Sequence, residues 1–133
     1  MIEALISVFK TFPKITAAYV FGSRVYGKTT KASDYDVAVL FKGDCTLDEL
    51  LDVTLKLADA LNVDLNLIDV VGLNNAPVEV AYDIIAKGKL TYCADDDLRV
   101  AFETRLMREY LDLKPYLDLY YDLLLKRLSK KIT

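Results

Sequence analysis

Histidine is absent from the 133-residue sequence, and cysteine, proline and glycine are scarce, with two, three and five residues. Without histidine the chain lacks the commonest general base and metal ligand, so any catalysis must use carboxylates, lysine, tyrosine, serine or cysteine. Cys45 and Cys93 have no C-x-x-C spacing, and free thiols in a reducing compartment are a better interpretation than a disulfide.

Long apolar runs and a basic charge balance are also missing. No stretch approaches the roughly 18 uninterrupted apolar residues that a membrane-spanning helix needs, and residues 1–10 lack the charged start and cleavage site of a signal peptide. A net charge of −3 argues against broad binding to DNA or RNA, because phosphate neutralisation requires a basic surface. We therefore expect a cytoplasmic protein that neither spans a membrane nor binds nucleic acid directly.

The sequence suits a single domain over residues 1–133, because hydrophobic residues make up 53% of it and can fill one core. Thr46 and Glu49 form a capping-box pattern at the start of one predicted helix. We expect helices over 2–12, 46–61, 77–86, 95–113 and 115–131, and strands over 15–21, 35–41, 63–70 and 89–93. This order predicts an α/β (α+β) fold in which a small mixed sheet has helices on one face, followed by a C-terminal helical arm.

The strongest signal in the sequence is Gly22-Ser23 followed, after a gap of ten residues, by Asp34-x-Asp36. Because side chains alternate along a strand, Asp34 and Asp36 project from the same face, with Tyr35 on the other. Neighbouring carboxylates repel one another, so keeping both charged favours a divalent cation between them. Oxygen ligands of this kind suit Mg²⁺ or Mn²⁺. An Asp-x-Asp pair by itself is also typical of solvated turns and helix caps, so the prediction depends on its neighbours.

Asp64 is the candidate for a third carboxylate, from a predicted strand that would lie beside the second one. A site for two metal ions needs about this many acidic ligands. Asp69 lies on the same predicted strand, and an error in the strand register would exchange the importance of the two. We favour Asp64, because the odd separation places the two aspartates on opposite faces and Asp64 points to the polar face.

Gly22-Ser23 predicts a phosphate-binding turn. Glycine lets the backbone approach a phosphate closely, and backbone amides at the start of a turn bind anions without a cationic side chain. Arg24 and Lys28 stand in the same loop, where they either neutralise a triphosphate or are ordinary solvated charges.

These residues resemble the polymerase-β superfamily of nucleotidyltransferases. Gly22-Ser23-Arg24, Ser33-Asp34-Tyr35-Asp36 and Val63-Asp64-Leu65 occur in the order of the family's motifs, and the short chain is similar to its minimal (MNT) branch. The resemblance implies that residues 1–94 are a catalytic core, that Asp34, Asp36 and Asp64 bind two Mg²⁺ ions, and that the Gly-Ser turn holds the triphosphate of ATP.

The C-terminal residues 98–128 resemble the tail of MNT-domain antitoxins that pair with HEPN-domain toxins. This resemblance implies transfer of AMP from ATP to a tyrosine of the partner toxin, with residues 95–133 as the helical contact region. Two alternatives remain open: a stand-alone nucleotidyltransferase that modifies a small-molecule hydroxyl, and an antitoxin that blocks its toxin by contact without any transfer. No motif in the sequence indicates the nucleotide preference or the oligomeric state.

Overall fold

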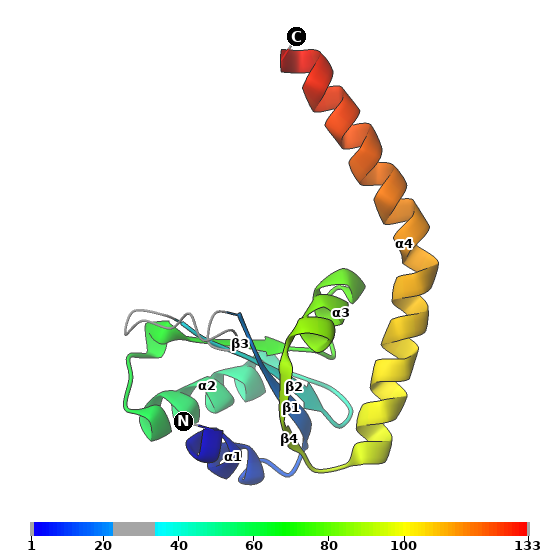
Figure 1. Cartoon of the computed structure of the whole chain (residues 1–133). Helices are drawn as coiled ribbons and strands as arrows, with labels where there is room; N and C mark the ends of the chain where they lie inside the picture. The colour runs from blue at the N-terminus through cyan, green and yellow to red at the C-terminus, as the bar shows by residue number, and fades with distance from the viewer. Residues whose placement is uncertain (1, 23–33, 133) are drawn as a thin grey trace.

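The computed structural model of the chain describes residues 2–22 and 34–132, which form a small α/β domain and one long helix (Figure 1). Within these residues one mixed sheet has the strand order β3-β2-β1-β4. β1 is antiparallel to both β2 and β4, whereas β3 is parallel to β2. The strands are β1 (Ile15–Phe21), β2 (Tyr35–Phe41), β3 (Ile68–Gly72) and β4 (Lys89–Cys93).

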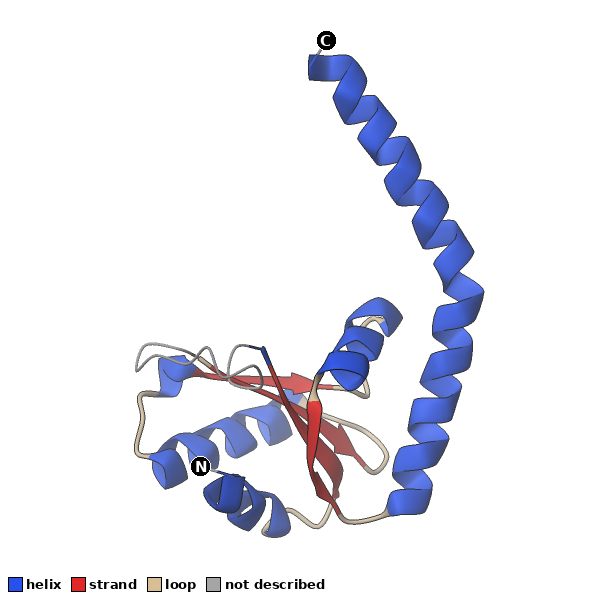
Figure 2. Ribbon diagram, in the orientation of Figure 1, coloured by secondary structure: helices blue, strands red, loops and turns tan. Residues whose placement is uncertain are grey.

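Helices cover both faces of the sheet, so the prediction of one covered face is wrong (Figure 2). One face packs on α1 (Ile2–Lys10) and α2 (Leu47–Leu61), and the other on α3 (Val78–Lys87) and the first half of α4 (Asp96–Ile132). The reason lies in the central strands, whose side chains are apolar on both sides and therefore require two covering layers. The predicted α/β class, mixed sheet and C-terminal helical arm are confirmed.

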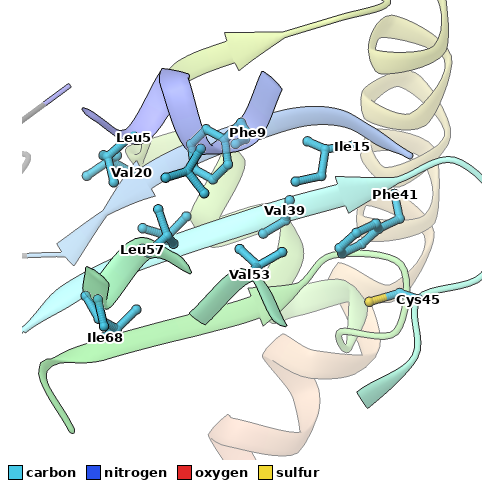
Figure 3. Packing of buried hydrophobic residues seen from close by; sticks show 14 residues of the cluster. Leu5, Phe9, Ile15, Val20, Val39, Phe41, Cys45, Val53, Leu57 and Ile68 are labelled. Atoms are coloured by element: carbon cyan, nitrogen blue, oxygen red, sulfur yellow. The ribbon is translucent and has the colours of Figure 1, made fainter. Parts of the chain in front are cut away.

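The two hydrophobic clusters follow the alternation of the strands. Figure 3 shows the cluster under α1 and α2, where Phe9 and Leu57 meet Val39 of β2. On the opposite face, Ala38 of β2 packs in a second cluster that includes Ile84 of α3. Successive residues of β2 thus enter different clusters, as its predicted period of two requires.

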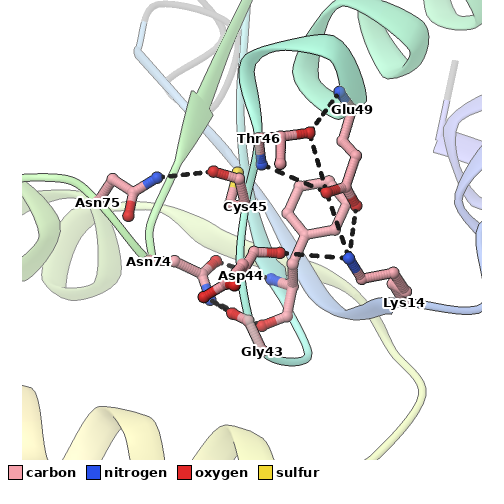
Figure 4. A network of polar contacts seen from close by, with 9 residues as sticks. Lys14, Gly43, Asp44, Cys45, Thr46, Glu49, Asn74 and Asn75 are labelled. Carbon is pink, nitrogen blue, oxygen red and sulfur yellow. Dashed lines mark hydrogen bonds and ion pairs between the residues drawn. The ribbon is translucent and has the colours of Figure 1, made fainter.

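A polar network fixes the loop between β2 and α2 (Figure 4). The predicted capping box is present, since Thr46 Oγ1 accepts from the Glu49 amide at 3.2 Å and Glu49 Oε1 accepts from the Thr46 amide at 3.3 Å. Lys14 also pairs with Glu49, at 3.0 Å. From the other side, Asn74 donates to the carbonyl oxygen of Phe41 at 2.7 Å. These bonds hold the end of β2 and the start of α2 in one place.

Two predicted boundaries are wrong. The expected strand over 63–70 begins only at Ile68, because residues 65–67 form the short 3₁₀ helix η2 (Leu65–Leu67). The expected break at Pro115 is absent, and α4 continues through it as one helix that bends along its length (Figure 1). Proline removes one backbone hydrogen bond to the residue four positions earlier, Leu111, which is exposed, so that water can solvate its carbonyl group.

A buried hydroxyl group ties α4 to the centre of the sheet. Tyr19 of β1 is only 2% exposed, and its hydroxyl donates to Glu103 Oε1 of α4 at 2.6 Å. Burial, followed by this bond to Glu103, raises the pKa of Tyr19. Arg99 donates to the other oxygen of Glu103 at 3.1 Å. The first turns of α4 are therefore held in a fixed orientation, whereas its distal half extends beyond the sheet (Figure 1).

The described part of the chain contains no helix with the length and apolarity to cross a membrane. Cys45 and Cys93 are both free thiols, as the sequence predicts, and burial is the main cause that raises the pKa of each.

Candidate active site

Asp36 lies in β2 on the face of the sheet that α3 and α4 cover. It shares this face with Ala38, whereas Tyr35 packs against the opposite cluster. Asp34 stands directly before the strand and is exposed. The predicted opposite faces of Asp36 and Tyr35 agree with these positions, whereas the side on which Asp34 projects stays a prediction.

The aspartate beside Asp36 is Asp69. In the parallel pairing of β2 with β3, Asp36 and Asp69 are Cα partners, and the next pair on this face is Ala38 with Val71. Asp69 is exposed and Asp36 is half-buried. Two carboxylates from neighbouring strands therefore lie side by side at the edge of the sheet, as the sequence predicts. The second of them is Asp69, whereas the sequence favoured Asp64.

The prediction that Asp64 lies on a strand beside Asp36 is wrong. Asp64 is the N-cap of η2, where its Oδ1 accepts from the amide of Asn66 at 3.0 Å, and it is exposed. An aspartate that binds the backbone two residues further on is a common turn former. The β-branched run around Asp69 is the better strand, since Ile68, Val70 and Val71 favour a pleated sheet more than Leu65 to Leu67 do. This signal in the sequence identifies Asp69.

Burial and neighbouring negative charges disfavour the ionised form of Asp36. Burial raises its pKa above the ordinary value, and the charges of Asp69 and Asp34 raise it further. The negative form of Asp36 is thus disfavoured in the folded chain, and a cation next to it would relieve the repulsion. Among the described residues, however, no three side chains of His, Cys, Asp or Glu are gathered into a ready metal cage. The side chains at this edge would have to turn toward a shared ion.

Gly22 follows β1 and brings its backbone against Asp36. Its φ is +78°, in the left-handed region, and a Cβ at this position would overlap Oδ2 of Asp36. Phe21, the residue before it, is the Cα partner of Asp36. The left-handed φ of Gly22 agrees with the predicted turn, whose next residue, Ser23, lies outside the described residues, and among the described atoms it is the carboxylate of Asp36 that fills the space left by the missing side chain.

The remaining predicted nucleotide-binding residues, Ser23, Arg24 and Lys28, lie outside the described residues. Their proposed contacts with a triphosphate therefore stay predictions.

A cavity of about 510 Å³ opens beside the carboxylates. Phe21 and Asp69 form its wall on the sheet, and both are direct neighbours of Asp36. Residues of α3 and α4, among them Tyr82 and Tyr110, complete it. The sequence does not predict this cavity, because no periodicity indicates that α3 and α4 enclose a space at this edge.

The strand order, the carboxylates and the adjoining glycine turn together define a nucleotidyltransferase. Comparison with known proteins agrees, since the family model for polymerase beta nucleotidyltransferases matches residues 3–97. The chain belongs to this family.

Several proteins of known sequence or structure are similar to the chain. Protein adenylyltransferase MntA of Shewanella oneidensis is 33% identical over 102 residues, which are 74% of this chain and 70% of that protein. A crystal structure of a toxin–antitoxin with AMP-PNP has a TM-score of 0.79 at 25% identity and covers 93% of this chain and 98% of its own. The MNT antitoxin in complex with the tri-AMPylated HEPN toxin of Shewanella oneidensis shares the fold, with a TM-score of 0.72 at 24% identity over 93% of this chain and 95% of that one.

A pair of glycine substitutions tests the contact between Gly22 and Asp36. Gly22→Ala and Gly43→Ala each place a side chain in the left-handed region, at φ +78° and +80°, at a cost of roughly 1–2 kcal/mol. Nothing lies within 4 Å of a Cβ at Gly43, whereas Asp36 blocks the one at Gly22. In urea unfolding, Gly22→Ala should therefore lower the free energy of unfolding more than Gly43→Ala does. Equal losses of unfolding free energy in the two variants would show that Asp36 does not restrict the space at Gly22.

Proposed function

We propose that this chain transfers AMP from ATP to a tyrosine of a partner HEPN-type toxin and thereby neutralises it. The observation that carries the proposal is the register that sets Asp36 beside Asp69, next to the Gly22 turn and a cavity able to admit an acceptor. Identity of 33% to a protein adenylyltransferase supports AMP as the transferred group. The related toxin–antitoxin structure with AMP-PNP, an ATP analogue, supports ATP as the donor. The toxin partner and its tyrosine come from the resemblance of the sequence to MNT antitoxins.

Asp34, Asp36 and Asp69 are the residues that would hold Mg²⁺, with Asp69 in place of Asp64. The fit is chemical: all three offer hard oxygen ligands, and a cation would favour the ionised form of Asp36, whose pKa is raised by burial and by the charges of Asp69 and Asp34. Two Mg²⁺ ions, the number that the family resemblance implies, would neutralise charge on the phosphates and lower the pKa of the attacking hydroxyl.

The residues of the chain itself position the reactants. The oxygen of the acceptor tyrosine attacks the α-phosphorus of ATP, a new O–P bond forms, and the bond to the bridging oxygen breaks as pyrophosphate leaves. Asp69, exposed at the cavity wall, takes up the phenolic proton on a carboxylate oxygen. Backbone amides of the Gly22-Ser23 turn, with Arg24 and Lys28, bind the triphosphate. Charge neutralisation and alignment thus supply most of the catalysis.

The distal half of α4 is the proposed contact with the toxin. Large apolar side chains are exposed there, with Leu119 57% and Tyr116 71% accessible. A soluble chain rarely leaves so much apolar surface uncovered on one element, and such surfaces mark protein interfaces. The helix extends away from the sheet, so a partner can reach several of its sides (Figure 1). The exposed apolar residues of this segment are Tyr116, Leu119, Tyr120, Tyr121, Leu123, Leu125 and Leu128.

Single aspartate substitutions separate this proposal from its alternatives. Asp36→Asn and Asp69→Asn should each lower the rate of AMP transfer by a factor of about a hundred or more, since each removes a charge aimed at the transition state. Asp64→Asn should retain transfer, because Asp64 caps η2. The measurement is incorporation of labelled AMP into a candidate HEPN-type partner protein. Full activity of Asp69→Asn, or its loss in Asp64→Asn, would reject the proposed site, and complex formation without label in the unsubstituted chain would reject transfer altogether.

A matched pair of leucine substitutions tests the arm. Leu119 of α4 and Leu55 of α2 are both exposed, at 57% and 48%, so arginine at either position should change stability by less than about 0.5 kcal/mol. Leu119→Arg should weaken binding of the HEPN-type partner at least about tenfold, because it places a charge in an apolar interface. The Leu55→Arg variant should bind the partner normally, because α2 packs on the face of the sheet opposite α4. Equal affinity of the two variants in calorimetry would contradict an interface on the distal half of α4.

A further inference from the structure

The cavity beside the carboxylates has three walls from separate parts of the chain. Phe21 and Asp69 flank Asp36 in the sheet and form the first wall. The second wall belongs to α3 and the third to α4. At about 510 Å³ the cavity is within the range of roughly 300–1,000 Å³ that is typical of sites for small molecules or single side chains with their flanking atoms. A group seated there would reach the carboxylates from the side of the helices.

Aromatic and apolar side chains make up much of the surface of the cavity. Tyr82 of α3 and Tyr110 of α4 stack face to face, with ring centroids 3.7 Å apart and an interplanar angle of 3°. Leu117 and Tyr121, further along α4, continue the lining. The two stacked rings leave no slot between them for another flat ring, but their edges and the leucine provide an apolar wall for a single aromatic side chain.

The charges around the cavity are mainly negative. Four carboxylates line it, those of Asp69, Glu79, Asp83 and Asp118, against one lysine, Lys114. Asp118 pairs with Lys114 at 2.7 Å and Asp83 pairs with Lys87 at 2.8 Å, so the excess negative charge of the lining comes from Asp69 and Glu79. A triphosphate is repelled from such a lining, and a neutral base gains nothing from it, whereas a cationic group is attracted.

We propose that this cavity is the acceptor subsite, which admits the tyrosine side chain of a partner segment that carries lysine or arginine next to that tyrosine. The phenol ring packs on the aromatic and apolar lining and brings its hydroxyl toward Asp69. The flanking cations face Glu79 and, beside its partner Lys87, Asp83 at the rim, and both acids are exposed. The inference rests on the proposed function, since an acceptor subsite has meaning only if AMP is transferred to a tyrosine.

Peptide binding tests the subsite without requiring catalysis. The probes are three short fluorescent peptides: one with a central tyrosine flanked by lysine and arginine, one with the tyrosine replaced by alanine, and one with glutamates as flanks. Their affinity for the whole chain is measured by fluorescence anisotropy in the presence of Mg²⁺ and α,β-methylene-ATP, whose methylene bridge between the α- and β-phosphorus prevents transfer of AMP. The basic tyrosine peptide should bind at least about tenfold more tightly than either of the others, because only it satisfies both the apolar lining and the acidic rim.

Two pairs of variants assign that binding to the cavity. Glu79→Gln combined with Asp83→Asn should weaken the basic tyrosine peptide by a factor of about three to ten and leave the affinity for α,β-methylene-ATP unchanged. The matched control, Asp48→Asn with Asp52→Asn, neutralises two exposed acids on α2 and should bind normally. Leu117→Trp should block the peptide by filling the cavity, whereas Leu119→Trp, two residues on and outside the lining, should not.

The outcomes separate this inference from the proposed function. Equal or undetectable binding of the three peptides, or normal peptide binding by the Glu79 and Asp83 variant, would overturn the acceptor subsite. A loss of affinity for α,β-methylene-ATP in that variant would overturn it too, by assigning the cavity to the nucleoside. Selective peptide binding without any transfer of AMP would uphold the recognition of the tyrosine segment and refute the proposed reaction.

Discussion

The parallel pairing of β2 with β3 is the constraint on which the site depends, because it sets Asp36 and Asp69 side by side on one face of the sheet. Two like charges at neighbouring positions are unfavourable for the fold, and the pKa of Asp36 is raised first by burial and then by the charges of Asp69 and Asp34. The rest of the architecture keeps them there. α2 makes the crossover that a parallel pair requires, and the buried apolar residues between the strands and α2 fix the register. Because the packing of the core keeps Asp36 and Asp69 side by side, a cation bound between them would relieve their repulsion.

The same face of the sheet connects the carboxylates with the long helix. Tyr19, in the middle of β1, reaches Glu103 of α4, and Leu106 is buried against the sheet one turn later. These contacts fix the orientation of the proximal half of α4, and the α4 wall of the cavity, from Tyr110 to Tyr121, begins just beyond them. A partner that binds the exposed distal half would therefore be held at a defined angle to the carboxylates. In the proposed function, docking of the partner and positioning of the acceptor would use the same helix, so a second domain would not be required.

Much of the fold can be predicted from the sequence, since β1, β2 and β4 lie at the predicted residues and the capping box of Thr46 and Glu49 is present. In these segments local propensity and hydrophobic periodicity agree. The start of β3 was predicted wrongly because alternation also continues through residues 63–67, where the Asp64 side chain instead closes a turn on the backbone. The continuity of α4 was missed for a related reason. Proline is a strong local signal, but an exposed helix can tolerate one lost bond, and this depends on solvent rather than on sequence.

For the site, the sequence predicts the glycine turn and the Asp34–Asp36 pair, because both depend on residues close together in the chain. The third carboxylate depends on strand register, a long-range property, and a shift of a few residues exchanges Asp64 for Asp69. The cavity depends on how α3 and α4 pack together, for which no single segment carries a signal. Local chemistry was thus readable, whereas the geometry that completes it required the three-dimensional structure.

The most direct measurement of the central claim is a crystal structure of the chain with Mn²⁺ and a non-hydrolysable ATP analogue, in which anomalous scattering locates the metal. The account predicts an anomalous peak bonded to carboxylate oxygens of both Asp36 and Asp69, with Asp64 remaining on the amide of Asn66. A metal bonded to Asp64, or a nucleotide bound with no metal at the Asp36–Asp69 pair, would contradict it.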